Sequence, residues 1–262
     1  MKKLTSTTIL VVIFIAQLPL LSNAQLAETY EAHGGLETFK QYGTLEYDMK
    51  DMPFSPAGVL NDHQLIDLNS RKILITSDTY KLGFDGNEVW ITPNTAALGI
   101  PPRFYSSTPF YFFGLPFLFA DPGANLESLG TKEINGKEYN VVKVSYDAGV
   151  GDTPDDDYIA YLDRETNRLK LANYIVTYPP LMQGKSIEEL ERHAVVYEQW
   201  QEANGLMVPK KISFYEWSDN KLGDKPLGFI RFENVSFKKE TPDPAIFQMP
   251  EGAEIDSSHK AQ

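Results

Sequence analysis

The sequence predicts a mainly β fold with α and β parts: a single large, curved antiparallel sheet. We expect a half-barrel of about ten strands, with a few helices covering its concave face. From Gly43 onward, apolar and polar residues alternate along most segments, which is the period of β-strands. Short turns rich in Asn, Asp and Gly join these segments, and such turns connect antiparallel neighbours. One aromatic, uncharged segment interrupts the strands and supplies apolar material to cover one face of the sheet.

The first element is a predicted helix over residues 25–41, where Leu26 and Tyr30 fall near one face. The run His33-Gly34-Gly35 interrupts this pattern, because glycine favours conformations outside the helix. We therefore expect a bend or two short helices.

The strands are predicted mostly as hairpin pairs. Asp85-Gly86 and Asn135-Gly136 are the clearest turns, because these residues tolerate positive φ. The predicted strands cover residues 43–50, 61–68, 71–76, 79–84, 88–92, 126–131, 137–147, 158–163, 168–178, 193–201, 206–217 and 227–238. Residues 186–192 predict a short acidic helix or loop. Residues 240–262 contain three prolines, which predicts an extended strand or strap.

The aromatic segment runs from Phe104 to Phe119, and eight of its sixteen residues are Phe or Tyr. Each large aromatic side chain buries roughly 150–250 Å², so the segment needs apolar surroundings. Thr108-Pro109 predicts the start of a helix, which Gly114 and Pro116 would kink.

Two interpretations of this segment remain open. It is either a core helix that fills the sheet or a mobile lid over an apolar cavity. Gly114 and Pro116 favour the lid, because they weaken a helix that core packing alone would want strong. In the predicted helix, Phe110, Phe113 and Phe117 share one face. The side chains predicted to line or gate a cavity are those of Phe104, Phe110, Phe112, Phe113, Phe117 and Phe119.

Residues 1–24 are predicted to be a signal peptide that is removed. Lys2 and Lys3 precede an apolar run over residues 9–21, and Ser22-Asn23-Ala24 favours cleavage before Gln25. A membrane anchor is the alternative, although the apolar run is short for a span of about 20 residues. The chain has no cysteine, so we expect neither disulfides nor a lipidated N-terminal cysteine. Residues 25–262 are expected to form one soluble domain, periplasmic or secreted.

The charge of the chain excludes some partners. Without the leader, 22 basic residues stand against 36 acidic ones, a formal net charge of −14. This balance disfavours nucleic acid and anionic lipid headgroups. We expect a monomer whose partners are a hydrophobic small molecule and, in one alternative, components of the cell envelope.

The sequence contains no recognisable catalytic motif, and we predict no enzyme activity, cofactor or metal. The four histidines, His33, His63, His193 and His259, are not spaced as metal ligands. The acidic loop 147–157 has carboxylates that suit Ca²⁺, but it does not match the EF-hand spacing, so a solvated loop is expected. The alternatives are a secreted hydrolase that uses His63 or His193 with scattered carboxylates, and an envelope partner-binding module.

Several motifs together resemble a known family. In order, they are His33-Gly34-Gly35-Leu36-Glu37, the hairpin strand 136–144, the strand end 161–167, Trp200 with 205–209, and the closing segments 229–235 and 247–253. This order resembles the outer-membrane lipoprotein carrier proteins and their lipoprotein-sorting-like relatives. The stretches 111–117 and 149–154 resemble, more narrowly, uncharacterised exported bacterial proteins of that architecture. The resemblance implies a half-barrel lidded by helices around a hydrophobic cavity, which holds lipoprotein acyl chains in the carrier family. The predicted function is therefore non-enzymatic binding or transport of a hydrophobic ligand in the periplasm.

Overall fold

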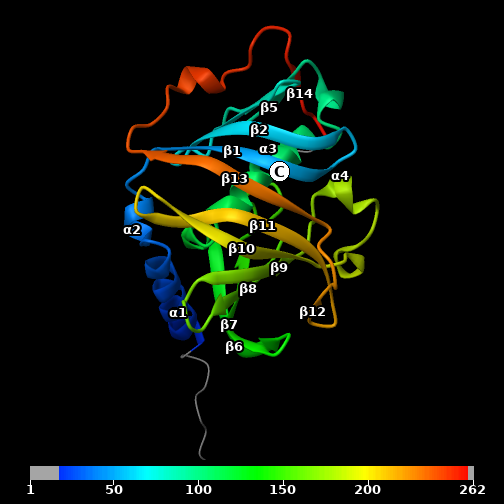
Figure 1. Cartoon of the computed structure of the whole chain (residues 1–262). Helices are drawn as coiled ribbons and strands as arrows, with labels where there is room; N and C mark the ends of the chain where they lie inside the picture. The colour runs from blue at the N-terminus through cyan, green and yellow to red at the C-terminus, as the bar shows by residue number, and fades with distance from the viewer. Residues whose placement is uncertain (1–17, 259–262) are drawn as a thin grey trace, which may run out of the picture.

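The computed structural model describes residues 18–258 of the chain (Figure 1). Most of the predicted signal peptide, residues 1–17, lies outside the described residues, as do residues 259–262. The first helix, α1 (Leu18–Ala32), runs through the predicted cleavage site. Among the described helices, none has both the length and the apolar character needed to cross a bilayer.

The strands of the described chain form one large antiparallel sheet, as predicted. The strands are β1 (Thr44–Ser55), β2 (Gly58–Asp67), β3 (Ile73–Thr76), β4 (Lys81–Phe84), β5 (Val89–Thr92), β6 (Ala124–Ile134), β7 (Lys137–Tyr146), β8 (Tyr158–Asp163), β9 (Leu169–Tyr174), β10 (His193–Ala203), β11 (Leu206–Ser218), β12 (Lys221–Leu222), β13 (Gly228–Lys238) and β14 (Glu254–Ile255). The described chain thus has 14 strands, against about ten expected for the half-barrel, and twelve of them overlap the predicted strand segments. The two-residue strands β12 and β14 are too short to produce an alternating pattern.

The sheet is built from two arms that meet at β13. Its order is β14-β5-β4-β3-β2-β1-β13-β11-β10-β9-β8-β7-β6, with β12 paired to β11. Near the C-terminus of the chain, β13 inserts between β1 and β11, and its register with β1 runs from Thr44 opposite Lys238 to Lys50 opposite Arg231. The last strand therefore joins the N-terminal hairpins to the C-terminal meander.

The helices are few and short, apart from α1 and α3 (Pro102–Gly114). The others are α2 (Leu36–Phe39), α4 (Pro179–Met182) and the 3-10 turns η1 (Thr95–Ala97), η2 (Phe117–Ala120), η3 (Ile187–Glu189) and η4 (Pro244–Phe247). Helix α3 contacts β3, β4 and β5 from one arm and β11 from the other. The sheet must therefore curve around α3, which lies behind β1 and β13 in the view of Figure 1.

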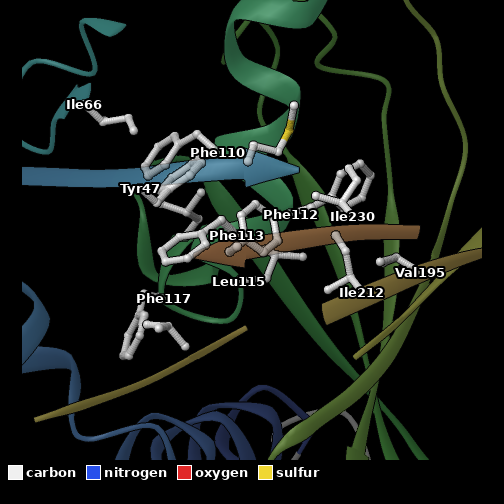
Figure 2. Close-up of a cluster of buried hydrophobic side chains, with 14 of the residues drawn as sticks. Tyr47, Ile66, Phe110, Phe112, Phe113, Leu115, Phe117, Val195, Ile212 and Ile230 are labelled. Carbon is white, nitrogen blue, oxygen red and sulfur yellow. The ribbon is translucent and has the colours of Figure 1, made fainter. Parts of the chain in front are cut away.

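The aromatic segment supplies much of the core on the concave face (Figure 2). The ring of Phe113 stacks on Tyr47 of β1 at 4.7 Å and meets Phe232 of β13 edge-on at 5.0 Å. In η2, Phe117 stacks on Phe39 at 4.5 Å. These contacts tie α3 and η2 to the middle of the sheet and to α2, since aromatic pairs add stability beyond the area they bury.

The C-terminal segment forms the predicted strap. After β13 it crosses the edge of the N-terminal arm, as Figure 1 shows in orange and red. The indole nitrogen of Trp90 donates a hydrogen bond of 2.8 Å to the Phe247 carbonyl. Farther along, β14 pairs with β5, so the strap covers what would otherwise be a bare sheet edge.

The corner between α1 and α2 is locked by a buried histidine. Gly34 adopts φ +99°, and a Cβ at this position would lie 2.2 Å from the Gly205 carbonyl oxygen, so only glycine fits. The Nδ1 of His33 lies 2.8 Å from the Met207 carbonyl, and the Leu169 amide donates to Nε2 at 3.3 Å. This geometry fits the neutral ring with its proton on Nδ1, and burial lowers the pKa of His33 to about 4.

This corner should weaken in mild acid. The unfolded chain takes up the His33 proton near pH 6.5 but the folded chain only near pH 4, so stability is lost as the pH falls between these values. We expect His33 to contribute a loss of about 2 kcal/mol in the free energy of unfolding between pH 7 and pH 5.

Urea titrations of the wild type and His33→Gln at pH 7, 6 and 5 measure this contribution. The variant should be less stable at pH 7, and the gap should narrow toward pH 5. A gap that stays constant with pH would contradict the role assigned to His33.

Candidate functional site

A cavity of about 560 Å³ lies between α3 and strands of both arms of the sheet. Most of its lining side chains are aromatic or aliphatic, including Phe84 of β4, Tyr174 of β9 and Phe214 of β11. Phe54 at the end of β1 and Leu181 of α4 also line it and are 41% and 37% exposed, so they mark its mouth. The cavity is therefore an apolar chamber inside the curved sheet with an apolar rim.

Helix α3 forms one wall, and it begins earlier than predicted. It starts at Pro102, and Pro109 lies inside it. Thr108 does not cap a helix: its hydroxyl donates to the Phe104 carbonyl at 2.6 Å within the helix. The start signal is instead Pro101-Pro102, because proline suits the first helical position. The helix ends at Gly114, so the predicted common face of Phe110, Phe113 and Phe117 is wrong.

The structure divides the six predicted ligand-binding residues into two groups. Phe104, Phe110 and Phe112 line the cavity. Phe113, Phe117 and Phe119 are buried and do not line it. Phe110 and Phe112 belong to the same core cluster as these three, so they contribute to the core as well as to the cavity wall. The segment is thus both a core element and a cavity wall, and ligand binding by any of the six stays a prediction.

The tyrosines of the C-terminal arm are cavity residues that the sequence did not single out. Tyr146, Tyr158 and Tyr174 lie on β7, β8 and β9 and all line the cavity. Tyr158 lies opposite Val144 and Tyr174 in the sheet register, and its ring is 5.9 Å from that of Tyr174. Only strand register brings these rings together, although each is visible in the sequence as a strand-end tyrosine.

A buried carboxylate fastens the first turn of α3 to the N-terminal arm. Asp62 of β2 accepts hydrogen bonds from the hydroxyls of Tyr105 at 2.5 Å and Tyr80 at 2.6 Å. Its other oxygen accepts from Gln64 at 3.0 Å, and Gln64 in turn accepts from Tyr47 at 2.7 Å. Burial raises the pKa of Asp62, while these donors stabilise its charged form. The network holds α3 in place through Tyr105.

The N-terminus of α3 is held by two distant acidic residues. The Arg103 amide, one of the unpaired donors of the first helical turn, donates to Asp256 of the strap at 2.7 Å. The Arg103 side chain donates from Nε and Nη2 to Asp152 of the acidic loop at 2.7 and 2.9 Å. Such a bidentate pair fixes both position and orientation.

The acidic loop uses its carboxylates within the protein. Besides Asp152, Asp156 accepts from the amide and hydroxyl of Thr177, both at 2.7 Å, and Asp157 lies 2.6 Å from Arg192. Over the described residues, no three or more His, Asp or Glu side chains are grouped as they would be to hold a metal ion. The loop therefore orders one side of the cavity mouth.

The two histidines of the hydrolase alternative lie away from the cavity. His63 is half-exposed and its Nδ1 is 2.9 Å from Asp48. His193 lies beside the Tyr174 ring at 6.2 Å, and neither histidine lines the cavity. The structure thus does not bring His63 or His193 to the place where a ligand would lie.

Comparison with known proteins identifies the fold. The profile of a family of unknown function (DUF6503) matches residues 79–191, which include α3 and the acidic loop. The structure resembles a LolA superfamily protein from Nitrosomonas europaea, with a TM-score of 0.52 at 12% identity, over 87% of this chain and 97% of that one. It also resembles a DUF1329 family protein from Desulfovibrio piger, with a TM-score of 0.47 at 10% identity, over 87% and 97% of the two chains. No curated protein matches the sequence. The chain therefore has the fold of the LolA superfamily, as the sequence resemblance predicted.

Substitutions of a core ring and of a cavity ring in the aromatic segment should differ in how much stability they remove. Phe113→Ala removes a ring packed on Tyr47 and Phe232, so it should lower the free energy of unfolding by about 3–5 kcal/mol. Phe104→Ala removes a half-buried cavity ring and should cost no more than about 1–2 kcal/mol. Chemical denaturation of both variants makes the comparison, and equal losses would contradict the division.

Proposed function

We propose that this protein binds an apolar, lipid-like ligand in the cavity beside α3 and carries it through the cell envelope without altering it. The observation that supports this most is the cavity itself. Its volume of about 560 Å³ lies within the range of roughly 300–1,000 Å³ that is typical of small-molecule sites. Its walls are largely hydrocarbon, so an apolar chain would gain about 0.8 kcal/mol for each buried methylene.

The fold supports the same role. A half-barrel whose α3 is fixed at its first turn leaves a chamber that the core side chains do not fill. The likeness to a LolA superfamily protein concerns the fold. We infer acyl-chain binding because the motifs of this sequence resemble those of the carrier family. The predicted signal peptide and the lack of cysteine favour a periplasmic location without a lipid anchor.

Binding fits the geometry better than hydrolysis does. A hydrolase needs an acid or base within hydrogen-bond reach of its substrate. His63 and His193 lie elsewhere than in the cavity lining. The charged groups of the lining are engaged with the protein itself: Arg71 pairs with Asp121 and Arg103 with Asp152. Asp156, the third lining carboxylate, accepts hydrogen bonds from Thr177. The lining thus offers an apolar surface that can bind a molecule, and its charged groups are engaged within the protein.

A cavity-filling substitution tests the location of binding. Val176 lines the cavity, whereas Val59 is 60% exposed and does not. Val176→Trp should occupy part of the chamber and weaken the binding of the neutral apolar dye Nile red by about tenfold or more, while the matched control Val59→Trp should bind like the wild type. Equal affinities for the two variants would contradict binding in this cavity.

Organic extraction and mass spectrometry test for a natural ligand. The full chain, freshly purified from its envelope fraction without detergent, should release a lipid class in near-stoichiometric amount. Val176→Trp, purified in the same way, should release much less. Extracts of the wild type that contain no lipid above the level of the Val176→Trp sample would contradict the proposal.

A further inference from the structure

Exposed apolar side chains from three segments lie at the mouth of the cavity. Phe54 of β1, Leu181 of α4 and Leu227, just before β13, are 41%, 37% and 47% exposed. Phe54 and Leu181 line the cavity. Leu227 adjoins Gly228, where an added Cβ would lie 3.4 Å from the ring of Phe54, so it belongs to the same opening. Phe54, Leu181 and Leu227 are called the apolar rim below.

The chain around the apolar rim carries no charge. Residues 52–61, 171–184 and 226–230 contain no Asp, Glu, Lys or Arg, although charged residues make up 23% of the chain. Figure 1 shows α4 and the start of β13 on the same side of the molecule. Single exposed apolar residues are normal on a protein surface, whereas a group of them in an uncharged setting marks an interaction surface.

The charges beside the apolar rim favour a neutral partner. Lys185 follows α4, but Glu188 and Glu189 come shortly after it, and Lys225 before β13 is preceded by Asp224. These flanking charges do not add up to a basic cluster, and the chain as a whole is acidic, with a formal net charge of −12. Attraction to anionic lipid headgroups needs a basic cluster. The rim therefore suits an uncharged apolar surface.

The apolar rim is too small for a stable interface between two proteins. A large apolar side chain offers at most about 250 Å², so three that are 37–47% exposed present on the order of 300 Å². A specific interface takes about 800 Å² from each partner. Contact with a bilayer needs no such area, because it is reversible and strengthens with the apolar surface that enters the headgroup region.

We propose that the apolar rim docks on the surface of a neutral lipid bilayer, with the mouth of the cavity against the membrane. This rests on the proposed function and names the partner that the mouth faces. The chamber and the hydrocarbon of the bilayer are then in contact, so an apolar molecule passes between them without exposing its methylenes to water. Phe54, Leu181 and Leu227 are the side chains that enter the headgroup region.

Sedimentation with sucrose-loaded phosphatidylcholine vesicles tests this inference. The protein, purified from its envelope fraction, should bind these vesicles. Leu227→Glu adds a carboxylate to the rim outside the cavity lining and should lower the partition coefficient about tenfold or more. Met249→Glu is the matched control: Met249 is 46% exposed on the strap, away from the mouth, so the variant adds the same charge and should bind like the wild type.

Vesicles that also contain phosphatidylglycerol should bind the wild type no more tightly, because the protein is acidic. Tighter binding to them would mean that cations make the contact, and would overturn the inference. A wild type that stays in the supernatant, or equal losses in the two variants, would overturn it as well. So would a dimer in analytical ultracentrifugation that Leu227→Glu dissociates, because a second copy would then cover the rim.

Nile red binding without vesicles, measured on the same samples, separates this inference from the proposed function. Leu227→Glu should bind the dye like the wild type, because Leu227 does not line the cavity. If the dye binds but the wild type ignores vesicles, only the docking is wrong and the apolar cavity stands. If the dye does not bind either, the proposed function itself fails.

Discussion

The hydrogen bonds that Asp62 accepts from Tyr105 and Tyr80 fix the position of α3, on which the cavity depends. A curved sheet of this size has a concave face that must be covered, and α3 is the element that covers it. Apolar packing alone is non-directional and would allow α3 to slide over the sheet. The hydrogen bonds of the buried Asp62 carboxyl group are directional, because each one fixes the distance and angle to its donor. With Asp256 and Asp152 holding the N-terminus of α3, this network fixes the helix at a distance that leaves a chamber.

The same segment therefore serves two purposes that the sequence could not separate. Rings such as Phe113 are needed to close the core, and rings such as Phe112 form the wall of a space that the protein leaves open (Figure 2). The charged side chains in that wall are likewise bound within the protein. The arginines are neutralised by acidic residues of the loop and of the segment after η2. The cavity is thus apolar over most of its surface.

Local patterns predicted most of the fold. The alternation of apolar and polar residues located the long strands, Asp85-Gly86 and Asn135-Gly136 marked true turns, and the bend at His33 is present. The failures all involve partners far apart in the chain. Nothing local shows that β13 inserts beside β1, or that Asp256 accepts from the Arg103 amide 153 residues away. The start of α3 was misplaced because Thr108-Pro109 and Pro101-Pro102 are both acceptable start signals, and tertiary contacts decide between them. The tyrosine cluster was missed for a similar reason, since strand register brings its rings together.

We propose that an acyl chain, and not the protein's own side chains, occupies the chamber between α3 and the concave face. A crystal structure of the full chain soaked with methyl 12-bromododecanoate tests this directly, because bromine is located by its anomalous signal. We expect a bromine site within the cavity, among rings such as Phe112 and Tyr174. A chamber closed by rearranged side chains, with bromine only on the outer surface of the sheet, would contradict it.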